Sequence, residues 1–308
     1  MPDVIRCQEL GKRYGSTVAV ESLDLTVEAG QVFGFLGRNG AGKTTTMRML
    51  LGLIRPTAGQ AWLNGRPVPD PAGLASVGAM IEEPASYPWL TGRRNLEVLA
   101  LCGPPLPAGR HQVTAVLDRV GLGAVADHKV KTYSQGMRQR LGLAAALLRE
   151  PTLLLLDEPS NGMDPAGIKE FRTLLRSLAD EGTTVFLSSH QLAEVEQTCG
   201  EIAVLDGGRL VEQGRVADLT AARTRVRVIL DAGDQPAARA LLDRWPLQAT
   251  GPDGLVVGTS SGREVNEVLG RGGVWAHQVL VERPALEETF LQLTETTTEE
   301  ARRAAASR

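Results

Sequence analysis

The 308-residue sequence has few cysteines and no long apolar run. Its three cysteines, Cys7, Cys102 and Cys199, are widely spaced and form no CxxC pair. This spacing argues against a disulfide framework or a zinc site and is typical of a reducing cytosol. The longest apolar runs, Leu141–Leu148 and Leu153–Leu156, fall far short of the roughly 20 residues that span a bilayer. The N-terminus lacks the apolar segment of a signal peptide, so a cytosolic protein is expected.

Aromatic residues and lysines are also scarce, with 5 Phe, 4 Trp and 3 Tyr, and most of the 33 basic residues are arginines. Against 36 acidic residues the net charge is only −3. This balance argues against a protein that binds nucleic acid through a broad basic field. At roughly 150 residues per domain, the length suggests about two domains, with enough chain for a core that needs no disulfides or metal.

The first 220 residues alternate between strand and helix patterns, which predicts an α/β fold with a mostly parallel sheet. An apolar run that ends at a glycine, Val32–Leu36, precedes a helical pattern formed by Met47, Leu50, Leu51 and Ile54. Further strands are predicted at Val18–Val27, Leu153–Leu156 and Thr184–Leu187, and the region between them is richer in helix signals.

A second, smaller α/β unit is predicted after about residue 220. Val226, Val228 and Leu230 alternate with less apolar positions, as in a half-buried strand. A final helix opens at Pro284 and carries Leu286, Phe290 and Leu293 on one face. Between them the pattern predicts a helix at Pro236–Arg244 and strands at Leu255–Val257 and Val274–Val281. The last residues have few apolar side chains to bury, so they are expected to fray.

A glycine-rich loop carries the first chemical signal. Residues 37–44, GRNGAGKT, match GxxxxGK[ST] between a predicted strand and a predicted helix, which is the context of a phosphate-binding loop. Glycines let the backbone N–H groups face inward, and the helix N-terminus adds positive potential. Lys43 is placed to reach the β- and γ-phosphates, and the Thr44 hydroxyl to bind Mg²⁺. The motif alone does not separate kinases, GTPases, motors and transporter ATPases.

Two acidic residues close the four-leucine strand. Asp157, at the end of a buried strand, is predicted to hold Mg²⁺, and Glu158 is predicted to orient and deprotonate an attacking water. On its own, a solvated pair of acids at a strand end is common. No NKxD motif is present, which disfavours a GTPase.

A serine and a glycine precede the acidic strand, in the segment YSQGMRQRL at residues 133–141. Ser134 is predicted to be a helix N-cap, whatever else it does. Together with Gly136 at a helix N-terminus it can also form an anion site. The helix that follows is predicted to have an apolar face formed by Met137, Leu141, Ala144, Ala145 and Leu148.

The order of these motifs resembles the ATP-binding-cassette (ABC) ATPases. The phosphate loop, the serine-glycine signature, LLLLDE, a segment from Ser160 to Pro165, and His190 follow one another as in that family. The resemblance covers residues 1–220 and implies a P-loop NTPase cassette with a mixed-sheet core and a helical subdomain at about 84–150. A small C-terminal accessory α/β domain at 221–296 and a frayed tail at 297–308 would follow.

The resemblance also implies a head-to-tail homodimer with two ATP molecules sandwiched between its subunits. Lys43, Glu158 and His190 would be catalytic, with His190 sensing the γ-phosphate. Mg²⁺ would be held by Thr44, Asp157 and Glu82. ATP would be bound by Tyr14 stacking on adenine, by Ser134, Gly136 and Asp164 acting across the interface, and by Gly37, Asn39, Gly40, Ala41, Gly42, Lys43, Thr44 and Thr45.

Three positions depart from the family pattern. Gln135 replaces the first glycine of the usual serine-glycine-glycine signature, and Arg38 stands where proline is common. Glu82 holds the position of a glutamine that takes part in Mg²⁺ or water binding, and it adds negative charge near the phosphates. In that segment the sequence is similar to ATPases of bacitracin and lantibiotic exporters. Trp89 follows closely and is either an anchor for a transmembrane partner or a core aromatic.

The expected function is the ATPase subunit of an ABC-2-type exporter of the bacitracin, lantibiotic or daunorubicin type. It would power efflux of a drug, antibiotic, peptide or lipid through a separate permease and lie on the cytoplasmic face of the membrane, with no nucleic-acid partner. The alternatives are an ABC ATPase of cofactor assembly, translation or DNA repair, and a module that does not hydrolyse ATP. The sequence carries neither a second cassette nor a coiled-coil or zinc module, and Lys43, Asp157, Glu158 and His190 argue against a module without hydrolysis.

Overall fold

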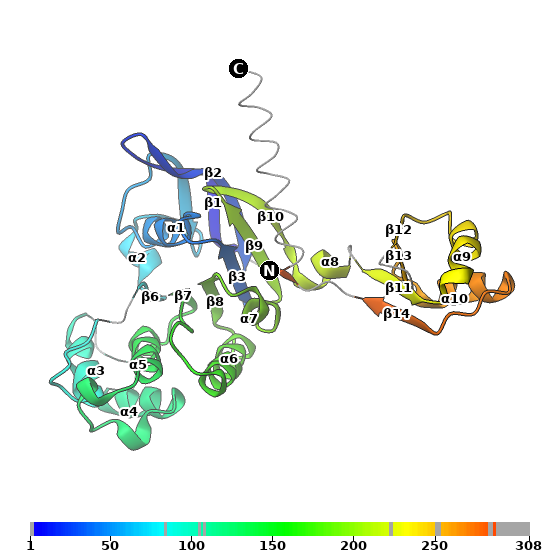
Figure 1. The fold of residues 1–308 in the computed structure, drawn as a ribbon. Helices are drawn as coiled ribbons and strands as arrows, with labels where there is room; N and C mark the ends of the chain where they lie inside the picture. Colours follow the sequence, from blue (N-terminus) through cyan, green and yellow to red (C-terminus); the bar gives the residue numbers. More distant parts are fainter. Residues whose placement is uncertain are drawn as a thin grey trace. The chain divides into compact units, whose positions relative to one another are not determined.

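The computed structural model describes residues 3–82, 85–103, 106, 109–221, 224–249, 254–282 and 286–287. The chain divides into two compact units, residues 1–213 and 214–308. Figure 1 shows the first unit coloured from blue to green and the second from yellow to orange.

A six-stranded sheet forms the centre of the first unit, in the order β10-β9-β3-β8-β7-β6. Strand β3 runs parallel to β8 and β9, and β7 runs parallel to β8 and β6, which confirms the predicted parallel sheet. Parallel strands place their C-terminal ends at one edge, so loops far apart in sequence meet there. The strands are β3 (Val32–Gly37), β6 (Val77–Met80), β7 (Leu153–Asp157), β8 (Thr184–Ser189), β9 (Glu201–Asp206) and β10 (Arg209–Arg215).

A second sheet of the first unit has the order β2-β1-β4-β5 and pairs antiparallel. Its strands are β1 (Asp3–Tyr14), β2 (Thr17–Glu28), β4 (Ala58–Leu63) and β5 (Arg66–Pro67). Only β2 is predicted from the sequence by its alternation. Strand β1 shifts register against β2 at several points, which breaks the period-two pattern that would have marked it.

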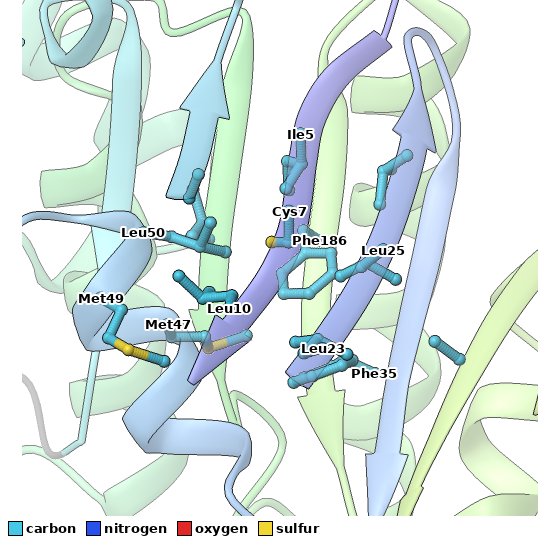
Figure 2. Close-up of a cluster of buried hydrophobic side chains, with 14 of the residues drawn as sticks. Ile5, Cys7, Leu10, Leu23, Leu25, Phe35, Met47, Met49, Leu50 and Phe186 are labelled. Atoms are coloured by element: carbon cyan, nitrogen blue, oxygen red, sulfur yellow. The ribbon is translucent and has the colours of Figure 1, made fainter. Parts of the chain in front are cut away.

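The core of the first unit joins the two sheets and helix α1 (Lys43–Leu50). In Figure 2 side chains from β1 and β2 face Phe35 of β3 and Phe186 of β8, whose ring centroids are 5.1 Å apart. Burial raises the pKa of the Cys7 thiol to about 12, so this core cysteine is not a reactive thiolate at neutral pH. Helix α1 ends at Leu50, earlier than predicted; Leu51 is its C-cap, and Gly52 (φ +68°) turns the chain before Ile54.

The part of the chain that connects β6 to β7 contains three helices that pack on one another. They are α3 (Gly92–Leu101), α4 (Arg110–Arg119) and α5 (Gln135–Leu147). Helix α5 also packs on β6. Leu141, Ala144 and Leu148 of the predicted apolar face are buried, and burial extends beyond that face to Gln139, Gly142, Leu143, Ala146 and Leu147. The unit also contains α2 (Pro71–Leu74), α6 (Pro165–Asp180), α7 (Leu192–Glu196) and two 3₁₀ turns, Gly123–Val125 and Val130–Thr132.

The second unit has the strand and helix order βαββαβ, after a short helix α8 (Val216–Ala221). Its sheet order, β12-β13-β11-β14, with antiparallel pairs, is that of a split βαβ (ferredoxin-like) fold. Val226, Val228 and Leu230 are fully buried, as predicted. The elements are β11 (Arg225–Ile229), a 3₁₀ turn (Ala232–Asp234), α9 (Gln235–Leu241), β12 (Leu247–Ala249), β13 (Gly254–Val257), α10 (Gly262–Arg271) and β14 (Gln278–Glu282).

Two sequence expectations for this unit need correction. The strand predicted at Val274–Val281 begins only at Gln278, because Val274 and Ala276 pack into the core from a loop rather than from a strand. The helix predicted to end at Arg244 ends at Leu241. Of the predicted final helix, Leu286 is helical and buried, whereas Pro284, Phe290 and Leu293 lie outside the described residues. Within the described part of the chain, no helix is long and apolar enough to cross a bilayer.

Candidate functional site

The glycine-rich loop joins the end of β3 to the start of α1. Gly40 and Gly42 have φ of +83° and +104°, which a side chain rarely tolerates. A Cβ atom on Gly42 would also lie 2.5 Å from the carbonyl oxygen of Ala19. The loop borders an open pocket lined by Ala19, Arg38, Asn39, Gly40, Ala41, Gly42, Lys43, Thr44, Thr45 and Glu158.

Lys43 is the buried cation of this loop, with 6% of its side chain exposed. Its Nζ donates a hydrogen bond to the carbonyl oxygen of Gly37 at 2.6 Å and lies 3.3 Å from Oε1 of Glu158. The ammonium group therefore lies between the loop backbone and a carboxylate, at the floor of the pocket.

Three oxygen-bearing side chains meet beside it. The Thr44 hydroxyl donates to Oδ2 of Asp157 at 2.7 Å, and the Ser188 hydroxyl donates to Oδ1 of the same carboxylate at 2.5 Å. Asp157 and Ser188 are both buried. Oxygen donors of this type suit Mg²⁺, which takes one or two protein ligands and completes its shell with water and phosphates. Sequence reasoning did not identify Ser188, although it follows the predicted strand Thr184–Leu187.

Glu158 connects two predicted site residues from different strand ends. Its Oε2 lies 2.8 Å from Nδ1 of His190, while its Oε1 faces Lys43. The backbone of Glu158 has φ +48°, and its N–H donates to the Ser188 hydroxyl at 3.0 Å. The edge of the parallel sheet thus brings Lys43, Glu158 and His190 into one contiguous group.

The signature residues lie elsewhere in the described chain. Ser134 accepts a hydrogen bond from the N–H of Met137 at 3.2 Å, which confirms its predicted N-cap role for α5. Asp164 is also an N-cap and accepts from the N–H of Gly167 at 3.0 Å. Neither Ser134 nor Gly136 nor Asp164 is among the described residues that line the pocket around Lys43.

Gln135, the departure in the signature, packs on the loop before α6. A Cβ atom on Gly162 (φ +76°) would lie 2.1 Å from Cδ of Gln135, so the glutamine side chain covers this glycine. Gly136 faces Met163 of the same loop. The segments around Ser134 and Asp164 therefore contact each other within one chain, which the sequence pattern did not indicate.

Two further predicted residues lie at the surface. Tyr14 ends β1 with 48% of its area exposed, and Nζ of Lys12 lies 5.0 Å from its ring centroid. Glu82, in the loop after β6, forms an ion pair with Arg48 of α1. Neither is among the described residues lining the pocket around Lys43.

Comparison with known proteins identifies the family. The model of the family described as "ABC transporter" matches residues 20–161. Over 305 residues the chain is 38% identical to the bacitracin transport ATP-binding protein BcrA of Bacillus licheniformis, an alignment that covers 95% of this chain and 98% of BcrA. The chain belongs to the ABC transporter ATP-binding proteins.

Other ABC proteins agree with this assignment. The chain is 39% identical over 299 residues to the daunorubicin resistance ATP-binding protein DrrA3 of Streptomyces coeruleorubidus, covering 92% of this chain and 93% of the relative. A solved structure described as an ATP-binding subunit of an ABC transporter superposes with a TM-score of 0.64 at 27% identity, over 70% of this chain and 91% of that one. The predicted P-loop ABC fold and the ATPase class are confirmed.

Proposed function

We propose that this ABC protein is the ATPase subunit of an exporter that moves a drug, antibiotic, peptide or lipid through a separate membrane permease. The contiguous Lys43–Glu158–His190 group carries the proposal for hydrolysis. The full-length similarity to relatives named for bacitracin transport and daunorubicin resistance, which includes the second unit, supports export. An ATPase of cofactor assembly, translation or repair has no comparable support.

Each site residue has a chemical role in this proposal. Backbone N–H groups of the loop at residues 37–45 and the ammonium of Lys43 bind the phosphates of ATP. Thr44 and Asp157 would hold Mg²⁺, with Glu82 as a further proposed ligand, and the bound ion would supply neutralisation of the negative charge on the phosphates. Glu158 accepts a proton from the attacking water, and His190 orients that carboxylate and contacts the γ-phosphate. Catalysis then rests on positioning and electrostatics.

A homodimer completes the site. Ser134 and Gly136 open helix α5, whose N-terminus is suited to bind an anion, yet they do not line the pocket of their own chain among the described residues. In the proposed head-to-tail dimer they bind the γ-phosphate held by the partner, and Asp164 contacts the partner's phosphate loop.

Tyr14 is proposed to stack on the adenine ring, since an exposed aromatic face binds any base with little selectivity. We expect Tyr14→Ala to raise the KM for ATP about 5- to 150-fold, the range of one stacking contact, while kcat changes little. Steady-state kinetics at saturating Mg²⁺ measures both constants. Tyr87→Ala, which removes another half-exposed tyrosine, is the control. A fall in kcat with unchanged KM would contradict stacking.

The permease is proposed to dock beside Trp89. This side chain is 63% exposed, not a core residue, and its ring lies 5.5 Å from that of Tyr87, just before Thr91 caps helix α3. Exposed tryptophans are frequent anchors of interfaces, where truncation costs at least about 2 kcal/mol. We expect Trp89→Ala to weaken permease binding by about 30-fold or more.

Co-purification tests the docking and the exporter assignment together. The tagged chain is expressed together with a candidate permease from the same genome, and the membrane fraction is assayed for the complex and for transport. Trp275→Ala is the matched control, because Trp275 is 76% exposed and lies in the second unit. If Trp89→Ala binds the permease with full affinity, Trp89 is not an anchor of the interface. If the parent chain forms no complex with the permease, the exporter assignment is wrong.

A further inference from the structure

A second cation borders the pocket at the glycine-rich loop, besides the ammonium of Lys43. Arg38 is among the described residues that line this pocket, and its side chain is exposed to solvent. Within the part of the chain that the structure describes, the Arg38 guanidinium has neither an ion pair nor a hydrogen-bond partner. Lys43, in contrast, is buried and already contacts Glu158 and the carbonyl oxygen of Gly37. Of the two cations among these lining residues, Arg38 is therefore the one available to a ligand.

The backbone of Arg38 is held at the start of the loop. Its carbonyl oxygen accepts a hydrogen bond from the N–H of Ala41 at 3.1 Å and lies 3.4 Å from Nζ of Lys43. The preceding Gly37 fits closely against β9, since a Cβ atom on it would lie 2.7 Å from the carbonyl oxygen of Leu205. The Arg38 side chain thus starts from a fixed point beside the ammonium that is placed to reach the β- and γ-phosphates.

The charge of the pocket depends on Arg38. The charged side chains among its described lining residues are two cations, Arg38 and Lys43, and one carboxylate, Glu158. A neutral residue at position 38, such as the proline that is common in the family, would leave the lining without net positive charge. Arginine also presents a planar fork of N–H donors that can bind two oxygens of one phosphate at once.

We propose that the Arg38 guanidinium binds the terminal phosphate of ATP and makes the site prefer ATP to ADP. The terminal phosphate is the part of the nucleotide with the most oxygens open to a donor, and it carries about two negative charges. Arg38 lies at the end of the loop away from helix α1, whose N-terminus faces the inner phosphates. The inference rests on the proposed function, because it requires ATP at residues 37–45.

Calorimetric titration with ADP and with a non-hydrolysable ATP analogue, at one fixed Mg²⁺ concentration, measures the preference as the ratio of two Kd values. Arg38→Gln keeps a polar side chain and removes the charge. It is expected to weaken analogue binding about 5- to 10-fold, between an exposed ion pair and a hydrogen bond to a charged group, and ADP binding less than about two-fold. Arg38→Lys, which keeps the charge without the fork, is expected to retain part of the preference. The effect of Arg38→Gln should shrink as the salt concentration rises.

Controls separate this inference from the proposed function. Arg66→Gln removes an exposed arginine that pairs with Asp70 in the same unit and is not among the described lining residues, so it should leave both Kd values unchanged. If Arg38→Gln weakens ADP and the analogue equally, or weakens neither, the role of Arg38 is overturned while the nucleotide site stays intact. If the parent binds neither nucleotide, or if Lys43→Ala binds both normally, the proposed function fails and this inference fails with it.

Discussion

A Lys43→Ala chain is expected to lose ATP hydrolysis by at least about 100-fold, the scale of one preorganised charge-assisted donor removed from an active site. The physical reason is the position of the ammonium group. It is buried, is held 2.6 Å from the carbonyl oxygen of Gly37, and faces Glu158 at 3.3 Å. Without it, the carboxylate of Glu158 would face the triphosphate with no buried ammonium beside it to offset the repulsion.

The measurement combines nucleotide binding with steady-state hydrolysis. Weaker binding and lost turnover are both expected, and thermal unfolding verifies that the chain remains folded. Lys169→Ala is the matched control, because Lys169 is an exposed lysine of α6. If Lys43→Ala hydrolysed ATP with unchanged kinetics, the assignment of residues 37–44 as the phosphate loop would be wrong.

The second large effect is expected for Glu158→Gln. Loss of a general base typically slows a reaction about 10²- to 10⁴-fold, and the amide has nearly the same shape as the carboxylate. ATP binding should persist, because Lys43 and the loop backbone are unchanged and one negative charge near the phosphates is gone. We therefore expect an ATP-bound dimer that accumulates because it cannot hydrolyse its nucleotide.

Single-turnover kinetics measure the rate of hydrolysis. Light scattering coupled to size-exclusion chromatography measures whether the protein is a monomer or a dimer. The dimer should form with ATP and Mg²⁺ and should not form when ADP replaces ATP, which is the internal control. Normal turnover in Glu158→Gln would show that Glu158 is not the general base. A monomer that binds ATP tightly would instead count against the shared-site dimer.

Much of the site was predictable because its residues belong to short motifs, and the strands and helices that flank each motif are adjacent to it in the sequence. A strand, a glycine-rich loop and a helix define Lys43 and Thr44, and an apolar strand closed by acids defines Asp157 and Glu158. Parallel pairing of β3, β7 and β8 then places these residues together without any further signal. Sequence reasoning could therefore anticipate that Lys43 and Glu158 belong to one site, whereas His190 was assigned to it by the resemblance to the ABC ATPases.

The contacts that link separate loops were not predictable. Gln135 covers Gly162, and Arg48 pairs with Glu82, because of side-chain directions that tertiary packing fixes. The same limit applies to the fold. Strand β1 is hidden by its register shifts, and Val274 is apolar because it fills the core from a loop, which periodicity cannot distinguish from a strand.

The left-handed backbone conformation of Glu158 lowers the stability of the fold, whereas the carboxylate that it carries serves catalysis. A residue with a β-carbon held at φ +48° typically costs about 1–3 kcal/mol of folding free energy, and glycine would avoid most of this cost. Glutamate stays in this conformation because its N–H is held by Ser188 and its carboxylate lies between Lys43 and His190. Selection for heat resistance alone would thus favour glycine at position 158, and selection for ATP turnover would restore the acid.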